Sequence, residues 1–136
     1  MTRRSRAVGL TLFALLAPTV LATCSGPASN DPNGPVVVTF EVVDERYKVL
    51  LTEPADIRIA RQLLNGDEVP SIPNGRIVHE TGVNEGYSWS IDPADIEFAD
   101  VTVEECDGLP SDVETGVTGD RYCPWAATVI GIDPAG

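Results

Sequence analysis

Val103-Glu104-Glu105-Cys106 and Tyr122-Cys123-Pro124-Trp125 organise this chain, because they hold two of its three cysteines and one of its two tryptophans. In an exported protein two such cysteines are expected to form a disulfide, which here closes a loop of 16 residues. A loop of that size contributes about 3 kcal/mol in the chain-entropy description. Zinc ligation is the competing interpretation, but the sequence has a single histidine and no CxxC or HxxxH pair. We therefore predict a structural disulfide between Cys106 and Cys123, joining two strands near the C-terminus.

Residues 1–23 have the pattern of a signal peptide. A basic start, Arg3–Arg6, precedes the apolar run Ala7–Ala22, which is too short for a comfortable membrane span. The run Leu21-Ala22-Thr23-Cys24 resembles a bacterial lipobox, in which Cys24 becomes the lipidated first residue. Ordinary signal peptidase cleavage is the alternative, and it would leave Cys24 free or paired with another molecule.

Residues 24–35 are rich in Gly, Pro, Ser and Asn, which is typical of a flexible tether between an anchor and a domain. Lipidation at Cys24 also accounts for the odd third cysteine. We expect an exported lipoprotein on the extracellular face of the cell membrane, with secretion as the alternative.

The charge of the chain limits its partners. The 136 residues carry a net charge of −12, and no acidic residue occurs before Asp31. Without the N-terminal segment, six basic residues face 21 acidic ones, a net charge of −15. Nucleic acid is therefore excluded as a partner, because binding it requires Lys and Arg to neutralise phosphates. Cationic partners and divalent cations are favoured electrostatically, although the acidity also serves solubility alone.

The rest of the chain, residues 36–133, is long enough for one domain. The β-branched run Val36–Val43 and the alternating run Arg46–Leu51 predict two strands joined by a short turn. A helix is expected next, with Thr52 as N-cap, Pro54 in its first turn and Asn65-Gly66 as its stop. Its apolar face is formed by Ile57, Ala60, Leu63 and Leu64.

The middle of the chain predicts short strands separated by turns. Two prolines and Asn74-Gly75 predict a loop over residues 67–74. Strands are expected at 76–80, 87–91 and 96–105, with turns at 82–86 and 92–95 and a bulge near Ala99-Asp100. One helical turn capped by Ser111, a loop at 116–120 and a closing strand at 122–132 complete the chain. The expected class is α+β, with a mainly antiparallel sheet, one main helix and a disulfide-closed loop near the C-terminus.

Candidate catalytic and metal-binding residues are few. His79 is the only histidine and has no nucleophile motif beside it, so we predict no catalytic residues and no enzyme. The acidic run includes Asp92, Asp95, Glu97 and Asp100, whose oxygens suit Ca²⁺, but no EF-hand spacing is present. A Ca²⁺ site therefore stays an open alternative, with no firm metal ligand and no other cofactor. A small hydrolase using paired carboxylates is the least favoured alternative.

The loop closed by the disulfide is the expected contact with a partner. Its leading residues are Leu109, Pro110, Ser111, Asp112 and Glu114. Presentation of this loop to a protease, as in a protease inhibitor, is a further alternative. Trp89 is expected in the core, whereas Trp125 is expected to cover the disulfide.

Several short motifs occur in an order that is familiar. They are Ala60-Arg61-Gln62-Leu63-Leu64-Asn65-Gly66, Gly75-Arg76-Ile77-Val78, Tyr87-Ser88-Trp89-Ser90-Ile91-Asp92-Pro93, Glu105-Cys106-Asp107 and Cys123-Pro124-Trp125. The set resembles a family of small exported bacterial domains called calmodulin-binding-protein-like, which is similar to the N-terminal domain of a slime-mould calmodulin-binding protein. The resemblance covers residues 36–130 and implies no established catalytic residues.

Calmodulin itself is not an expected partner, because its targets are basic amphipathic helices and this chain is acidic. We predict a non-enzymatic exported domain that binds an unidentified protein or small ligand.

Overall fold

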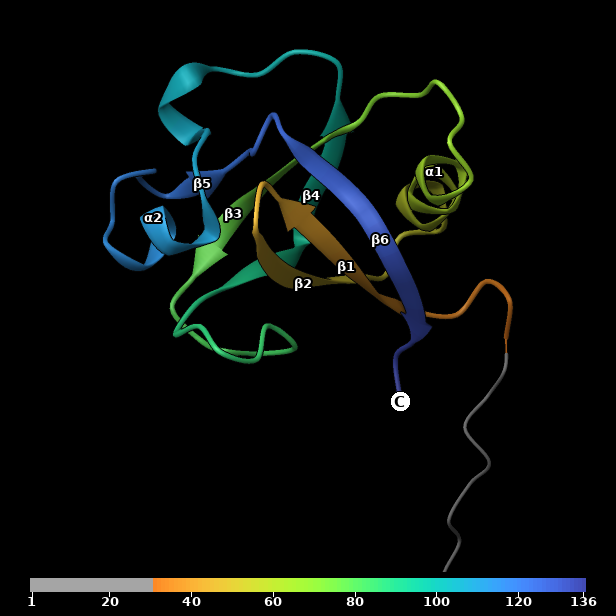
Figure 1. Cartoon of the computed structure of the whole chain (residues 1–136). Coiled ribbons are helices and arrows are strands. Elements are labelled where there is room, and N and C mark those ends of the chain that lie inside the picture. Colours follow the sequence, from red (N-terminus) through yellow and green to blue (C-terminus); the bar gives the residue numbers. More distant parts are fainter. Residues whose placement is uncertain (1–30) are drawn as a thin grey trace, which may run out of the picture.

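The computed structural model describes residues 31–136 (Figure 1). Two antiparallel three-stranded sheets form the domain, with strand order β2-β1-β6 in sheet A and β4-β3-β5 in sheet B. In chain order the elements are β1 Val36–Val42, β2 Glu45–Leu51, α1 Pro54–Leu64, β3 Ile72–Val78, β4 Ser90–Ala99, the 3₁₀ turn η1 Glu104–Cys106, α2 Pro110–Glu114, β5 Arg121–Tyr122 and β6 Ala127–Pro134. The α+β class is confirmed. None of the helices in this part of the chain is long and apolar enough to cross a membrane.

The β1–β2 hairpin forms as predicted. Every second residue of β1 is buried, and β2 buries Tyr47, Val49 and Leu51 on the same side. The register pairs Val42 with Glu45, so Val43 and Asp44 form a two-residue turn. Val43 has a φ of 59°, which is a left-handed conformation.

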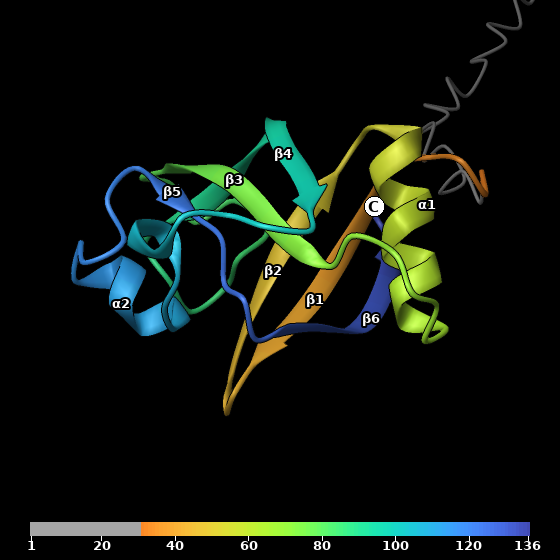
Figure 2. The same cartoon turned by 90° about the horizontal axis from the view of Figure 1, so that it is seen from above.

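Helix α1 is confirmed, but it begins one residue later than expected. Its N-cap is Glu53 rather than Thr52, whose hydroxyl donates to the carbonyl oxygen of Pro93 at 3.4 Å instead. Asn65 is the C-cap, and Gly66 follows at a φ of 84°, where glycine is favoured. The helix packs mainly against β6, at the opposite end of the molecule from α2 (Figures 1 and 2).

The loop predicted at residues 67–74 is wrong over its last three residues, because β3 already begins at Ile72. Two turn-forming residues misled the prediction. Pro73 is tolerated because β5 reaches only Gly75 and Arg76, so that edge of β3 is unpaired beside the proline. Gly75 is required by packing, since a Cβ there would clash with Cγ2 of Ile91.

The predicted turn at residues 92–95 is also wrong, because it lies inside β4. Between Gly75 and Ile77 the partners of β3 jump from Ile96 to Ile91, so the chain bulges at the predicted turn and then continues as strand. The strand predicted from Tyr87 begins only at Ser90. No bulge forms at Ala99-Asp100, where the strand ends instead.

The predicted closing strand is divided between the two sheets. Arg121–Tyr122 pairs with β3 in sheet B, whereas Ala127–Pro134 pairs with β1 in sheet A. The core between the sheets is aromatic: Tyr47 of sheet A lies 5.2 Å from Tyr122 of sheet B and 5.8 Å from Trp89, between ring centroids. Trp89 is 1% exposed, which confirms its core position.

Candidate binding site beside the disulfide

Cys106 and Cys123 form the predicted disulfide, with Cα atoms 5.1 Å apart. Cys106 ends η1, and Cys123 directly follows β5. Both side chains are buried, and the backbone N–H of Cys123 donates to the carbonyl oxygen of Cys106 at 2.7 Å. The disulfide therefore holds the segment that leaves β4 against the end of β5.

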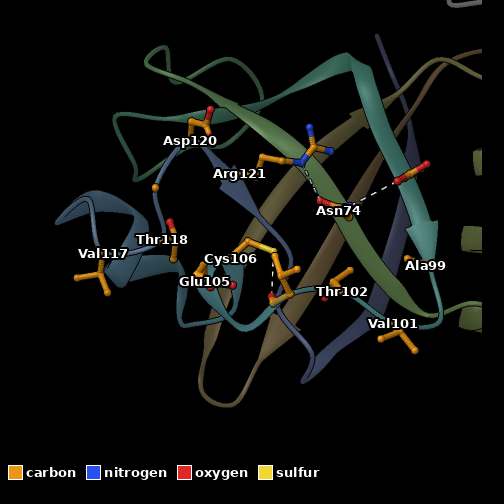
Figure 3. A pocket seen from close by; sticks show the side chains of 13 residues that line it. Asn74, Ala99, Val101, Thr102, Glu105, Cys106, Val117, Thr118, Asp120 and Arg121 are labelled. Atoms are coloured by element: carbon orange, nitrogen blue, oxygen red, sulfur yellow. Dashed lines mark hydrogen bonds between the residues drawn. The ribbon is translucent and has the colours of Figure 1, made fainter.

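A hollow of about 530 Å³ lies next to this disulfide (Figure 3), and we call it the disulfide hollow. Sheet B contributes Asn74, Glu97 and Ala99 to it. The segment 101–106 forms a second wall through Val101, Thr102, Val103, Glu105 and Cys106, and residues 117–121 form a third. The three walls come together only in the folded chain, because β3, β4 and β5 lie side by side.

Three valines stand at the edge of the hollow, and we call them the valine rim. Val101, Val103 and Val117 are 83%, 64% and 71% exposed. Val101 and Val103 were expected in a strand. They instead follow the end of β4, where no neighbouring strand covers them. Exposed apolar side chains gathered around one hollow are typical of an interaction site.

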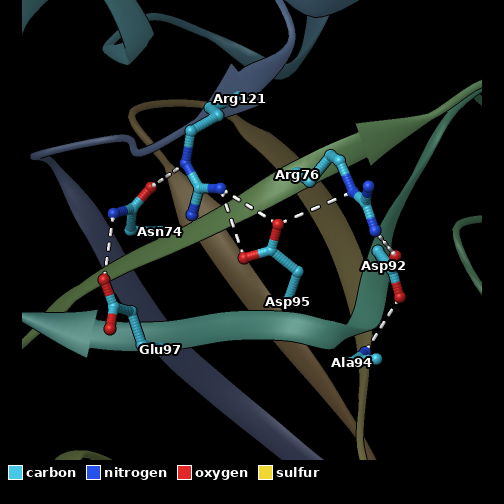
Figure 4. A network of polar contacts seen from close by, with 7 residues as sticks. All are labelled: Asn74, Arg76, Asp92, Ala94, Asp95, Glu97 and Arg121. Atoms are coloured by element: carbon cyan, nitrogen blue, oxygen red, sulfur yellow. Dashed lines mark hydrogen bonds and ion pairs between the residues drawn. The ribbon is translucent and has the colours of Figure 1, made fainter.

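The other side of the hollow is polar. Arg121 Nε donates to Asn74 Oδ1 at 3.1 Å, and Asn74 Nδ2 donates to Glu97 Oε1 at 3.4 Å (Figure 4). Arg121 also binds both carboxylate oxygens of Asp95, at 3.1 and 3.2 Å. This network fixes the side chains of β3, β4 and β5 relative to one another.

The network continues away from the hollow to the bulge of β4. Arg76 lies between two carboxylates, because it donates to Asp92 and lies 3.6 Å from Asp95. The pKa of Asp92 is lowered by the N–H of Ala94 and then by Arg76. A general acid needs a raised pKa, so this carboxylate does not have the environment of a catalytic acid.

The candidate Ca²⁺ ligands are not brought together around one point. Asp92 and Asp95 face arginines, and Glu97 accepts from Asn74. Asp100 lies elsewhere, in an open depression formed with residues 67–71. Within residues 31–136, no group of three or more carboxylate, cysteine or histidine side chains is placed to hold a metal ion.

The predicted contact residues at 109–114 are more enclosed than expected. Leu109 is the N-cap of α2, and Asp112, rather than Ser111, supplies the capping carboxylate, because Asp112 Oδ2 accepts from the N–H of Leu109 at 2.8 Å. Pro110 and Val113 are buried.

Two carboxylates tie α2 to the rest of the domain. Ser111 donates to Glu45 of β2 through its N–H at 2.8 Å and through its hydroxyl at 2.7 Å. Glu114 accepts from the N–H of Ser88 at 3.1 and 3.2 Å. The segment is thus a packed helical turn and not an extended bait for a protease. The exposed part of this loop begins after it, at residues 115–117.

Trp125 holds the second wall of the hollow by two hydrogen bonds. Its indole Nε1 donates to Thr102 Oγ1 at 2.7 Å, and its backbone N–H donates to Asp107 Oδ1 at 2.8 Å. The side chain is 46% exposed. These bonds attach the segment 102–107 to the chain just after the disulfide.

His79 and Thr118 differ in their relation to the hollow. His79 is half-buried at the last residue but one of its segment's turn, just beyond the end of β3, and is not among the residues that line the hollow. Thr118, which does line it, is 3% exposed, and its hydroxyl has no hydrogen-bond partner among the described residues. The lipidation candidate, Cys24, and the signal peptide lie outside the described residues.

The residues missed in the sequence are Asn74, Arg121 and the valine rim. Val101 and Val103 carried a signal, since two β-branched residues stand between the carboxylates Asp100 and Glu104. That pattern is equally typical of a half-buried strand, and only the end of β4 distinguishes the two.

Comparison with known proteins gives one match. No curated protein and no solved structure matches the chain. The sequence profile of the BP-74 N-terminal domain matches residues 34–136, which is the whole folded region and agrees with the calmodulin-binding-protein-like resemblance seen in the motifs. The chain therefore belongs to this N-terminal domain family, which indicates a binding-type domain rather than an enzyme.

Proposed function

We propose that this chain is an exported, lipid-anchored binding domain that holds a segment of a partner protein in the disulfide hollow. The observation that carries this proposal is the valine rim, three apolar side chains that are 64–83% exposed around one hollow of about 530 Å³. Leaving such side chains in water forgoes roughly 25 cal/mol for each Å² of apolar surface. A partner that covers the rim recovers this free energy.

A protein segment suits the hollow better than a small molecule. Small-molecule sites enclose most of their ligand and are lined by apolar and aromatic side chains. Among the described residues, no aromatic side chain lines the disulfide hollow, and its valines stand at the edge rather than at the bottom. A partner chain lying across the edge contacts all three valines at once.

The walls are also prepared for binding. The disulfide, the two hydrogen bonds of Trp125 and the Arg121–Asn74–Glu97 network hold the three walls together without a ligand. Preorganised walls reduce the entropy lost when a partner binds.

The position of the hollow suits an anchored domain. The chain enters the domain at residues 31–35, on the α1 side, and β5 and α2 lie at the other end (Figures 1 and 2). An anchor at Cys24 followed by a tether would therefore leave the hollow accessible. A buried disulfide is compatible with export.

The binding function is tested by panning a display library of random short peptides on the purified protein. The critical variant replaces the valine rim, Val101→Ser with Val103→Ser and Val117→Ser. The control is Val43→Ser, because Val43 is 65% exposed and belongs to the β1–β2 turn, outside the hollow. We expect selected peptides to bind the rim variant about tenfold more weakly or worse, and to bind the control like the parent protein.

Peptides that bind the rim variant and the parent equally would refute the proposal, as would a failure to select any peptide. Thermal unfolding of each variant shows whether a loss of binding reflects a loss of the fold.

The anchor is tested separately, by phase partitioning in a detergent that separates on warming. The exported protein is expected in the detergent phase and the Cys24→Ser variant in the aqueous phase. Partitioning of both proteins into the aqueous phase would show that the protein is secreted without a lipid.

A further inference from the structure

We infer that the segment recognised by the disulfide hollow is cationic and aliphatic: lysine or arginine side chains alternating with small apolar ones. This inference rests on the proposed function and adds the chemistry of the partner. It follows from the charges around the valine rim, which are unbalanced, and from the lack of aromatic side chains among the described residues of the lining.

Carboxylates outnumber cations in the lining. Glu97, Glu105 and Asp120 carry negative charge there, and Arg121 is the one basic residue among the described residues that line it. Arg121 is already engaged, because it binds Asp95 and Asn74. The hollow, as formed by residues 31–136, therefore has a net negative charge and no cation left to receive an acidic partner.

Two of these carboxylates are free to bind a cation. Glu105 and Asp120 are exposed, and neither makes an ion pair within the described part of the chain. They stand on different walls of the hollow, Glu105 near Cys106 and Asp120 beside Arg121 (Figure 3). A chain that crosses the hollow can thus place one basic side chain at each wall.

The valine rim lies close to the same carboxylates in sequence and suits the stems of basic side chains. Lysine and arginine place their methylene groups along apolar surfaces and keep their charged ends at the edge. Val103 is two residues before Glu105, and Val117 is three residues before Asp120. Each valine can therefore contact the stem of a side chain whose charged end meets the neighbouring carboxylate.

An unpaired polar group points to a ligand independently of the charges. Thr118 lies on the wall between Val117 and Asp120, and its buried hydroxyl has no partner among the described residues. Buried hydroxyls are usually hydrogen-bonded. A backbone group of the bound segment is a suitable partner once residues 117–119 adjust around it.

The overall charge of the domain adds a long-range effect. The region from Asp31 onward carries −15, so cationic segments are attracted from a distance and acidic ones are repelled. Electrostatic complementarity of this kind raises the association rate and excludes partners of the wrong sign.

The experiment uses the peptides selected on the parent protein. Their composition is compared with that of the unselected library, and each is tested against the variant Glu105→Lys with Asp120→Lys. The control variant is Asp44→Lys with Glu80→Lys, which reverses two exposed carboxylates outside the hollow. We expect enrichment in lysine, arginine and aliphatic residues, binding about tenfold weaker in the first variant, and unchanged binding in the control.

Salt provides a second measurement. Between about 0.01 M and about 1 M salt the screening length falls from about 30 Å to about 3 Å, so affinity should fall steadily. Peptides without basic enrichment that still depend on the valine rim would overturn this inference and leave the proposed function standing. Peptides indifferent to the valine rim would overturn both.

Discussion

Val43 is strained for the sake of a tight turn. Its φ of 59° is a left-handed conformation, which is a true outlier for a β-branched residue. The turn between Val42 and Glu45 has only two residues, and such turns favour glycine or asparagine at positive φ. The strain of a left-handed L-residue is about 1–2 kcal/mol.

Replacement of Val43 by glycine should therefore stabilise the protein. We expect the free energy of unfolding to rise by about 1 kcal/mol, because the relief of strain exceeds the entropy cost of glycine in the unfolded chain. Urea unfolding measures this, with Val43→Ala as a control that keeps the left-handed penalty. A glycine variant less stable than the parent would show that Val43 is not strained.

Asn84 is the buried polar residue on which the loop before β4 depends. It is 1% exposed, accepts from the N–H of Lys48 at 2.9 Å and donates to the carbonyl oxygen of Trp89 at 3.0 Å. Asn84→Ala leaves two backbone groups unsatisfied, so we expect a loss of about 3 kcal/mol. Chemical unfolding measures the loss, and Asn65→Ala, at an exposed asparagine, should cost far less. Equal effects of the two substitutions would contradict the assignment.

Two aspartates should affect stability in opposite directions. The folded pKa of Asp92 is lowered, first by the N–H of Ala94 and then by Arg76, so its contribution is present above its unfolded pKa near 3.8 and disappears as pH falls through the folded value. The pKa of Asp56 is raised by burial, then by Glu53 and by Glu97, so its ionisation disfavours the fold. We expect Asp92→Asn to destabilise the protein at pH 7, with a difference that vanishes in acid.

Asp56→Asn should behave differently, being neutral or stabilising at pH 7. Thermal unfolding over a pH series distinguishes the two variants. A pH-independent effect of Asp92→Asn would mean that its charge does not matter.

At the scale of elements, β5 is the part of the fold most dependent on covalent help. It has two residues and pairs only with Gly75 and Arg76, whereas β1 is paired along its whole length on both sides. The disulfide, the Arg121–Asp95 ion pair and the hydroxyl of Tyr122, which donates to the Gly108 carbonyl at 3.0 Å, hold it in place. Burial raises the pKa of Tyr122, so this hydroxyl stays protonated.

Removal of the disulfide should loosen β5 before the rest of the domain. We expect Cys106→Ser with Cys123→Ser to lose about 3 kcal/mol in the free energy of unfolding. Hydrogen exchange should accelerate at residues 101–107 and 117–123 and remain slow in β1 and β2. Uniform acceleration in all strands would show that the disulfide stabilises the whole fold rather than the hollow.

At the scale of the whole molecule, charge acts against the compact fold. From Asp31 onward, 21 acidic residues face six basic ones, and four of the six make ion pairs. The remaining negative charges repel one another. We expect sodium chloride to raise the melting temperature, because screening weakens this repulsion more than it weakens the few ion pairs.

Sucrose at equal osmolality is the control, since it stabilises without screening charge. A melting temperature that falls with salt would show that the network of Arg76 and Arg121 outweighs the net repulsion.

The fold class, the hairpin, α1 and the disulfide were predicted because each depends on neighbouring residues or on the cysteine count. Alternation in Val36–Leu51, the helical spacing from Ile57 to Leu64 and Asn65-Gly66 as a stop act over one or two turns of chain. Errors arose where local signals competed with pairing. Pro73 and Asp92-Pro93 have turn chemistry, but β3 and β4 absorb both, one at an unpaired edge and one in a bulge.

The sequence alone thus determined the α+β class, the hairpin and helix α1, since periodicity and turn chemistry are local properties. Only the tertiary structure decided that the last strand divides between two sheets at residues 123–126, and that Val101, Val103 and Val117 gather around one hollow. The physical reason is that exposure depends on which strands end where. A valine that leaves the sheet and a valine that stays in it have the same sequence pattern, and they differ only in what the rest of the chain places beside them.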